Sequence, residues 1–284
     1  MSLDSARSVL ALLMVAASGC QTPQDPKVAV VRLEPAPALT CKPEPRYRWL
    51  DALGHPYSEE FRKAFDYKKA EVELRFAREA PILGGMLKAR KLKPNFAYQM
   101  KLVGMPPFLW GEKGDAAANR GIGDVGRWWR PGKEGSNAYF FEGDTDKEQM
   151  EGYLVFGYFV TDAEGNADVE FRVDSSFHVL WKVSQWEPSP GDAPPTHHTV
   201  VGEAGRWGYD RSFPPGEFGL YAEAQYGRPP IGQARLAAGR YRCFFLLTEE
   251  SFHDYYNPDG GDWAAALAAL VDFAIAPAPA PAGQ

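Results

Sequence analysis

The stretch Gly152–Val183, GYLVFGYFVTDAEGNADVEFRVDSSFHVLWKV, decides the fold of this chain. Residues 153–160 are apolar on both faces of an extended chain, which is typical of a central strand that is covered on each side. The segment TDAEGNA then supplies the Asp, Gly and Asn residues of a tight turn. After it, apolar residues alternate with charged ones through residues 168–174, as in a strand with one buried face. The stretch therefore predicts a β-hairpin.

The same two-residue period occurs elsewhere in the chain. It is clear in KAEVELRFAR (residues 69–78) and in NFAYQMKLVG (residues 95–104), and each of these segments reads as a half-buried strand. Near the C-terminus Val271, Phe273 and Ile275 alternate in the same way. No strand–helix–strand rhythm and no internal repeat is present, which favours antiparallel sheets.

One short helix is expected at Tyr57–Phe65, with Ser58 as its N-cap and two acidic residues in its first turn. With that helix included, residues 57–276 are expected to form one all-β domain. We predict a predominantly antiparallel two-sheet β-sandwich, jelly-roll or immunoglobulin-like, with long loops. Aromatic residues make up 13% of the chain and supply large side chains with strand propensity for its core.

The order Gly239-x-Tyr241-x-Cys243 resembles the tyrosine corner of immunoglobulin-type sandwiches, although the second cysteine of those domains has no counterpart here. Cys41 and Cys243 are the cysteines left once Cys20 is set apart. In an oxidising compartment these two cysteines are able to form a disulfide. The alternative is that Cys243 is a small buried apolar residue and Cys41 carries a free thiol.

The N-terminal residues predict export. Arg7 is followed by the apolar run Val9–Ala17, which is too short to span a bilayer, and by small residues up to Cys20. This order resembles the lipobox of bacterial lipoproteins. The resemblance implies that residues 1–19 are a signal peptide and that Cys20 carries a diacylglycerol on its sulfur and an acyl chain on its amino group. A plain signal peptide cut after residue 17 or 19 is the alternative.

The segment that follows is rich in proline, so residues 20–56 are expected to be a lipidated tether and residues 277–284 a flexible tail. Two or three acyl chains anchor a protein persistently. Gln21 stands where an Asp would imply the inner membrane, and the resemblance therefore implies the outer membrane. The expected location is the bacterial cell envelope, with the domain facing the periplasm or the exterior.

The charges argue against a nucleic acid partner. The formal net charge is −6, and the Lys and Arg residues are spread along the chain instead of being clustered. The chain contains no nucleophile elbow, Walker loop, zinc-binding helix or dinucleotide-binding glycine motif. No cofactor is predicted. The glycines of residues 121–126 lack the strand that should precede a nucleotide-binding loop.

Five tryptophans lie in segments that read as irregular loops. Exposed rings at one end of a sandwich would stack on sugars or bind an apolar partner. The alternative is that these rings cover sheet edges and hold the loops to the core. The candidates are Trp110, Trp128, Trp129, Trp186 and Trp207.

The triplet Ser-Phe-His occurs twice, and neighbouring strands would bring His178 and His253 together with Asp254 nearby. Two dispersed histidines fall short of the three or four ligands that a metal site requires. His197 and His198 would point to opposite sides of a strand, and the alternative is that they lie in an exposed loop. The sequence therefore predicts a membrane-anchored envelope lipoprotein whose sandwich binds a glycan or protein partner, or has a structural role, without catalysis. The alternative is a loop-site enzyme or metal-binding protein that uses His178 and His253.

Overall fold

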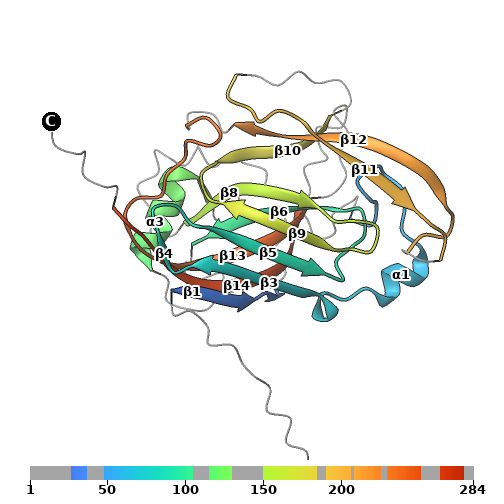
Figure 1. The fold of residues 1–284 in the computed structure, drawn as a ribbon, viewed down its shortest axis with the longest axis horizontal. Coiled ribbons are helices and arrows are strands. Elements are labelled where there is room, and N and C mark those ends of the chain that lie inside the picture. Colours follow the sequence, from blue (N-terminus) through green and yellow to red (C-terminus); the bar gives the residue numbers. More distant parts are fainter. Residues whose placement is uncertain are drawn as a thin grey trace, which may run out of the picture.

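The computed structural model describes residues 27–36, 48–104, 115–129, 150–183, 190–205, 208–224, 229–250 and 263–277. Their fold is an all-β sandwich with two helices and one 3₁₀ turn (Figure 1). The first sheet has the order β1-β3-β5-β9 and is antiparallel throughout. Its strands are β1 (Val28–Arg32), β3 (Glu71–Ala77), β5 (Gly84–Arg90) and β9 (Ala167–Arg172).

The second sheet is larger and has the order β2-β14-β13-β6-β8-β7, while β4 (Glu79–Ala80) adds a short parallel pair to β14. The other pairs in this sheet are antiparallel. Its strands are β2 (Glu34–Pro35), β14 (Trp263–Ile275), β13 (Gly239–Glu250), β6 (Ala97–Val103), β8 (Glu151–Val160) and β7 (Arg127–Trp129).

The main core lies between these two sheets. The first sheet contributes buried residues such as Leu74 and Leu87. The second sheet contributes Tyr98, Phe245 and other buried side chains on the face that meets the first sheet. Phe171 of β9 contacts Phe245 of β13 with ring centroids 5.4 Å apart, so aromatic rings join the two layers. This arrangement confirms the predicted β-sandwich.

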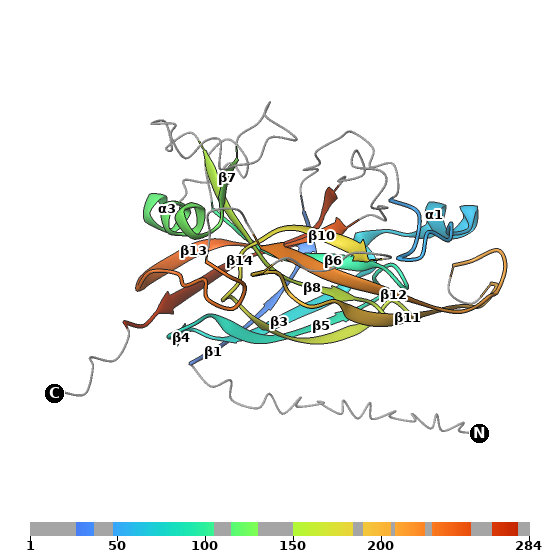
Figure 2. The ribbon, with the colours of Figure 1, turned by 90° about the horizontal axis from the view of Figure 1, so that it is seen from above.

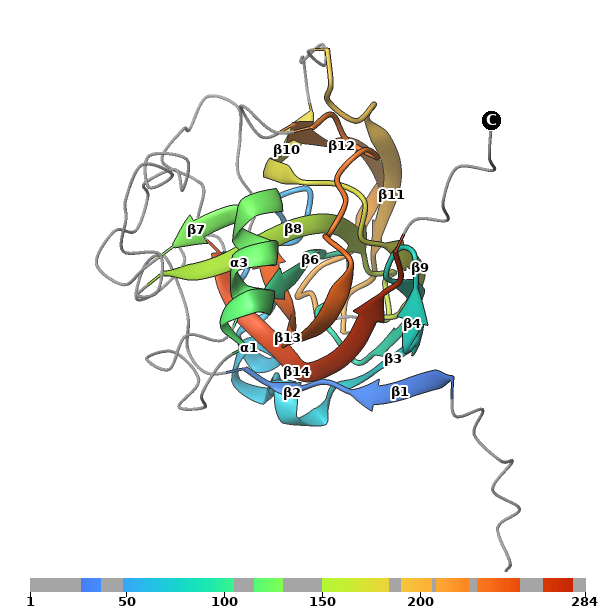
Figure 3. The same ribbon diagram turned by 90° about the vertical axis from the view of Figure 1, so that its left-hand side faces the viewer.

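A third sheet covers the other face of the second one. Its order is β10-β12-β11, from β10 (Phe177–Val183), β12 (Phe213–Ala224) and β11 (Thr196–Gly202). Figure 3 shows it beyond β8, on the side of the large sheet that is opposite to β3.

The third sheet changes the environment of β6. Ala97 packs against Phe218 and Leu220 of β12, and all seven residues of β6 are buried, including Gln99 and Lys101. The prediction that residues 95–104 have one solvated face was therefore wrong, because a pattern of alternating polar residues does not show that another layer covers them.

The predicted hairpin at residues 153–173 was also wrong. The turn forms as expected: Asp162 Oδ1 accepts hydrogen bonds from the backbone N–H groups of Glu164 (2.9 Å) and Asn166 (2.8 Å), and Gly165 has φ +77°. The two strands then separate, because β8 pairs with β6 and β9 pairs with β5. The turn is thus a connection between two sheets.

Two strands lie inside the segment that was predicted to be a tether. In β1, Ala29 is buried, and Leu33, which follows the strand, is buried too. The register of β1 on β3 runs from Val28 opposite Ala77 to Arg32 opposite Glu73. The correction has a physical reason: the nearby prolines favour extended backbone, which a strand at a sheet edge also adopts.

The helix α1 (Glu59–Ala64) confirms the prediction for residues 57–65, since Ser58 Oγ accepts a hydrogen bond from Phe61 N at 3.1 Å. The 3₁₀ turn η1 (Tyr67–Lys69) follows it. The other helix, α3 (Ala116–Val125), was not predicted. The described helices contain no segment long and apolar enough to cross a membrane.

The helix α3 starts at Asp115, whose Oδ1 accepts hydrogen bonds from Ala117 N and Ala118 N at 3.0 and 3.2 Å. Asn119 joins the helix to β8: its Oδ1 accepts a hydrogen bond from Gly152 N at 2.6 Å, and its Nδ2 donates one to Met150 O at 2.9 Å. The glycines that sequence analysis set aside as a nucleotide loop belong to this helix and its C-cap.

The geometry at the start of β13 matches the tyrosine corner that the sequence resembles. The hydroxyl of buried Tyr241 donates a hydrogen bond to Ala237 O at 2.8 Å.

We expect Tyr241→Phe to lower the free energy of unfolding by about 1 kcal/mol, because the carbonyl loses its partner. Urea unfolding checks this. The control is Tyr158→Phe, whose hydroxyl bonds Thr196 at an exposed position and should matter less; equal effects would contradict the special role of Tyr241.

Candidate functional site

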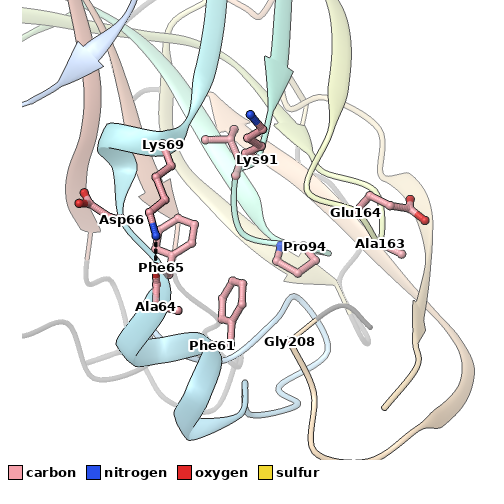
Figure 4. A pocket seen from close by; sticks show the side chains of 11 residues that line it. Phe61, Ala64, Phe65, Asp66, Lys69, Lys91, Pro94, Ala163, Glu164 and Gly208 are labelled. Carbon is pink, nitrogen blue, oxygen red and sulfur yellow. Dashed lines mark hydrogen bonds between the residues drawn. The ribbon is translucent and has the colours of Figure 1, made fainter. Parts of the chain in front are cut away.

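A cleft of about 530 Å³ lies at the end of the sandwich that carries α1, and we call it the α1 cleft (Figure 4). Its floor is apolar and comes from two parts of the chain. Phe61 and Phe65 stand one helical turn apart on α1 with ring centroids 5.4 Å apart, and Leu92 and Pro94 come from the segment between β5 and β6. Ala64 ends the helix and lines the same space.

Charged residues of both signs form the rim of the α1 cleft. Asp66 and Lys69 lie on one side in Figure 4, with Lys91 and Glu164 on the others. Lys69 Nζ donates a hydrogen bond to Ala64 O at 3.1 Å, and Lys91 pairs with Glu71. This ion pair holds the pKa of the Glu71 carboxyl below its usual range.

The wall formed by residues 91–95 has an unusual backbone. Lys91 and Asn95 have φ values of 62° and 52°, and among the described non-glycine residues these two have positive φ. Backbone hydrogen bonds join this wall to the turn after β8, from Leu92 N to Gly165 O (3.0 Å) and from Asn95 N to Asp162 O (2.9 Å). These bonds fix the distance between the two sides of the cleft.

Behind this wall lies a buried ion pair. Lys93 Nζ is 2.8 Å from Glu249 Oε1 of β13 and donates a hydrogen bond to Arg48 O at 2.7 Å. Its ammonium group also stands over the rings of Trp49 and Phe96, 4.6 and 4.5 Å from their centroids. Burial lowers the pKa of Lys93 to about 8, although the nearby Glu249 carboxylate acts in the opposite direction.

The Glu249 carboxylate has further partners. Tyr67 donates a hydrogen bond to its Oε1 at 2.7 Å, and Arg48 Nε lies 3.0 Å from its Oε2. The Tyr67 hydroxyl is also 3.1 Å from the hydroxyl of Tyr98. Burial and the Glu249 charge raise the pKa of both tyrosines. A buried charge with this many polar partners is the arrangement that makes burial tolerable.

A second buried carboxylate, Asp51, organises the segment before α1. Its Oδ1 accepts hydrogen bonds from Leu53 N (2.9 Å) and His55 N (2.8 Å). Its Oδ2 accepts one from the Tyr209 hydroxyl (3.0 Å) and lies 3.1 Å from His55 Nδ1. The imidazole of His55 stacks on Phe213 with centroids 3.8 Å apart.

This Asp–His pair resembles part of a nucleophilic triad, which requires a nucleophile hydrogen-bonded to the imidazole. Within the described part of the chain the side-chain partner of His55 is Asp51. The described residues also contain no group of three or more His, Cys, Asp or Glu side chains arranged for a metal ion. The described contacts of Asp51 and His55 therefore fit a structural support for Tyr209 and the loop before α1.

The tryptophans predicted as ligand-binding residues do not share one exposed surface. Trp128 lies in β7, not in a loop, and is buried beside Met150. A side chain at Gly123 of α3 would collide with its ring, so Trp128 fills the space between helix and sheet, and its prediction as an exposed ligand-binding residue was wrong. Trp129 is half-buried in the same strand. The remaining three candidates lie outside the described residues: Trp110, Trp186 and Trp207.

Most of the other residues predicted as site residues lie outside the described residues. His178 belongs to β10, and His253 and Asp254 lie outside the described residues. Cys243 is buried in the main core, where burial raises the pKa of its thiol. Cys20 and Cys41 lie outside the described residues, so the lipid attachment and the disulfide between Cys41 and Cys243 stay predictions.

Lys93 and Glu249 were not predicted as site residues, although the sequence around each carries a signal. Lys93 precedes Pro94-Asn95 at the start of a strand, and Glu249 follows an apolar run that ends β13. Neither signal names a partner 156 residues away in the sequence. Comparison of the chain with protein-family models, with curated proteins and with solved structures finds no significant match.

Proposed function

We propose that this chain is a bacterial envelope lipoprotein, anchored through Cys20, whose β-sandwich binds a protein partner without catalysis. The observation that carries the binding role is the α1 cleft, with its apolar floor between charged residues of both signs. An apolar side chain of a partner would bury its surface on this floor, and polar groups beside it would meet the rim.

The chemistry of the lining favours a protein over a glycan. A sugar that stacks on an aromatic ring also needs hydrogen-bonding groups next to the ring, because its hydroxyls lose water on binding. The side chains of the floor are phenylalanine, leucine, proline and alanine, which offer none. The charged side chains lie around them, as in the polar rim of a protein–protein interface.

The groups behind the cleft support a role without catalysis. Lys93 and Glu249 are enclosed and paired with each other; Tyr67 donates a hydrogen bond to Glu249 Oε1, and the Arg48 carbonyl accepts one from Lys93. Their function in the proposal is mechanical: they hold the segment that carries Leu92 against β13, so that the cleft has one shape before a partner arrives. A site formed in advance loses less conformational entropy on binding.

A blocked cleft tests the proposal. Ala64 lines the cleft and is exposed, so Ala64→Trp would fill the space without removing a buried contact. The matched control is Lys63→Trp, on the same helix but outside the lining. For peptides selected on the wild-type chain from a random displayed library, we expect Ala64→Trp to weaken binding at least about tenfold, equal to about 1.4 kcal/mol, and Lys63→Trp to leave it unchanged.

The measurement is the dissociation constant of the selected peptides by calorimetry, with the melting temperature of each variant as the check on folding. If selection yields no peptide, and a glycan array yields a ligand that binds the wild type but not Ala64→Trp, the partner is a glycan and the protein assignment fails. Ligands of either class that bind the blocked variant as well as the wild type would overturn the role of the cleft.

A further inference from the structure

The distance between the proposed anchor and the fold is short. Cys20 precedes Lys27, the first described residue, by seven positions, and seven residues span at most about 25 Å even when fully extended. The strand β1 begins at the next residue and is hydrogen-bonded to β3. A chain acylated at Cys20 therefore cannot move its β1 end far from the headgroups, and one surface of the sandwich must lie near the bilayer.

That end of the sandwich carries a surface of suitable chemistry. Val30, Arg75 and Met86 are directly opposite one another across β1, β3 and β5. Val30 and Met86 are 38% and 39% exposed, which makes them two of the three exposed large apolar side chains among the described residues. Apolar side chains on both sides of an arginine suit the boundary between headgroups and acyl chains.

Two more cations lie beside this surface, at the ends of β1 and β3 that are nearest the anchor. Lys27 O accepts a hydrogen bond from Arg78 N at 2.8 Å, so Arg78 lies beside the point where the described chain begins. Arg75 and Arg78 are exposed and form no ion pair within the described part of the chain. The acids at the border are Glu73, two residues before Arg75 on the same face, Glu79, next in the chain after Arg78, and Glu170, which is opposite Met86.

Resting on the proposed anchor, we infer that this surface, formed by Lys27, Val30, Arg75, Arg78 and Met86, docks on the anionic lipid headgroups of the membrane that holds Cys20. The cations are attracted to the negative surface potential, and the two apolar side chains enter the interface. We call it the headgroup surface.

The inference also orients the α1 cleft. The strand β3 starts at Glu71, after α1 and η1, and ends at Ala77, opposite Val28 of β1. Figures 1 and 2 accordingly show the start of β1 and the helix α1 at opposite ends of the sandwich. With the headgroup surface on the bilayer, the cleft lies at the end of the sandwich that is farther from the anchor.

Site-specific fluorescence tests the inference on the full acylated chain. In a Cys41→Ser background, an environment-sensitive label is placed at Val30→Cys, at Met86→Cys or, as control, at Val201→Cys. Val201 is the third exposed apolar residue, 36% exposed, and lies on β11 of the third sheet. The labelled protein is placed in vesicles that contain phosphatidylglycerol and a quencher attached to the headgroups. We expect at least about twofold quenching of the label at positions 30 and 86 and none at 201, because a label is quenched only when it lies within or next to the headgroup layer.

A charge reversal completes the test. Arg75→Glu combined with Arg78→Glu should bring quenching at positions 30 and 86 down to the level at 201, whereas Lys63→Glu, on α1 at the other end of the sandwich, should not. The intact mass of the same sample separates the two proposals. If the protein is acylated but quenching is equal at all three positions or absent from all three, the proposed headgroup surface is wrong and the proposed anchor stands. A mass without acyl chains on Cys20 overturns the proposed anchor and this surface together.

Discussion

Glu249→Gln is expected to lower the free energy of unfolding by about 3–5 kcal/mol, one of the two largest effects that we predict for a single substitution in this chain. Gln has nearly the same shape as Glu, so the packing around residue 249 is retained. The substitution leaves the Lys93 ammonium group buried without the carboxylate that lies 2.8 Å from it. Equilibrium urea unfolding of both proteins measures the difference.

A double variant separates the charge effect from the packing effect. Lys93→Met combined with Glu249→Gln removes both charges and keeps a long side chain between Trp49 and Phe96. We expect it to recover most of the stability that Glu249→Gln loses, because buried ion pairs often contribute little compared with apolar residues of similar volume. A double variant that is less stable than the single one would show that hydrogen bonds of Lys93, such as that to Arg48 O, dominate instead.

The pH dependence gives an independent check of the same mechanism. Burial lowers the pKa of Lys93 to about 8 in the folded chain, below its pKa in the unfolded chain. The free energy of unfolding therefore rises as the pH increases from about 8 to the pKa of the unfolded chain. The Glu249 charge raises the pKa of Lys93, and its loss lowers that pKa further. The difference in free energy of unfolding between the wild type and Glu249→Gln should therefore become smaller as the pH rises toward about 8, and should stay constant above that pH. A deficit that is the same at every pH would contradict a role for the Lys93 charge.

The sequence was sufficient for the fold class because strand patterns are local. The alternation in residues 69–78 appears in β3 with every second residue buried, and Ser58 caps α1 as predicted. The same reasoning failed for β6, where Gln99 and Lys101 are polar yet buried. Ala97, on the same face of β6, packs against Phe218 and Leu220 of the third sheet, and no local pattern encodes a contact with residues so far away in the chain.

The candidate site was less accessible to sequence reasoning for a related reason. Each of its parts looks ordinary by itself: a short amphipathic helix, a Lys-Pro-Asn segment and an acid at the end of an apolar strand. Lys93 meets Glu249 because β6 and β13 are neighbours in the large sheet, with Tyr98 opposite Glu249 in the register. The tryptophans drew attention as the largest aromatic side chains, but Trp128 fills the core between α3 and β8.

Gly165→Ala is the second substitution with a large expected effect, because two separate penalties add at this position. With φ at +77°, a non-glycine residue is strained, at a cost of about 1–3 kcal/mol. A Cβ atom would also lie 2.1 Å from the carbonyl oxygen of Leu92, so the backbone of the cleft wall must move. Gly232→Ala is a matched control, since Gly232 has φ +84° and no atom within 4 Å of the added Cβ.

The difference between these two variants measures the close approach alone. Gly232→Ala should cost about 1–3 kcal/mol, and Gly165→Ala should cost more and should also disturb the α1 cleft, because Leu92 N bonds Gly165 O and both Leu92 and Glu164 line the cleft. Urea unfolding measures the first effect, and the affinity of a cleft-binding peptide measures the second. Equal losses of stability in the two variants, with unchanged peptide affinity, would mean that the turn after β8 and the segment before β6 move independently. The cleft would then lack the rigid wall on which its proposed function depends.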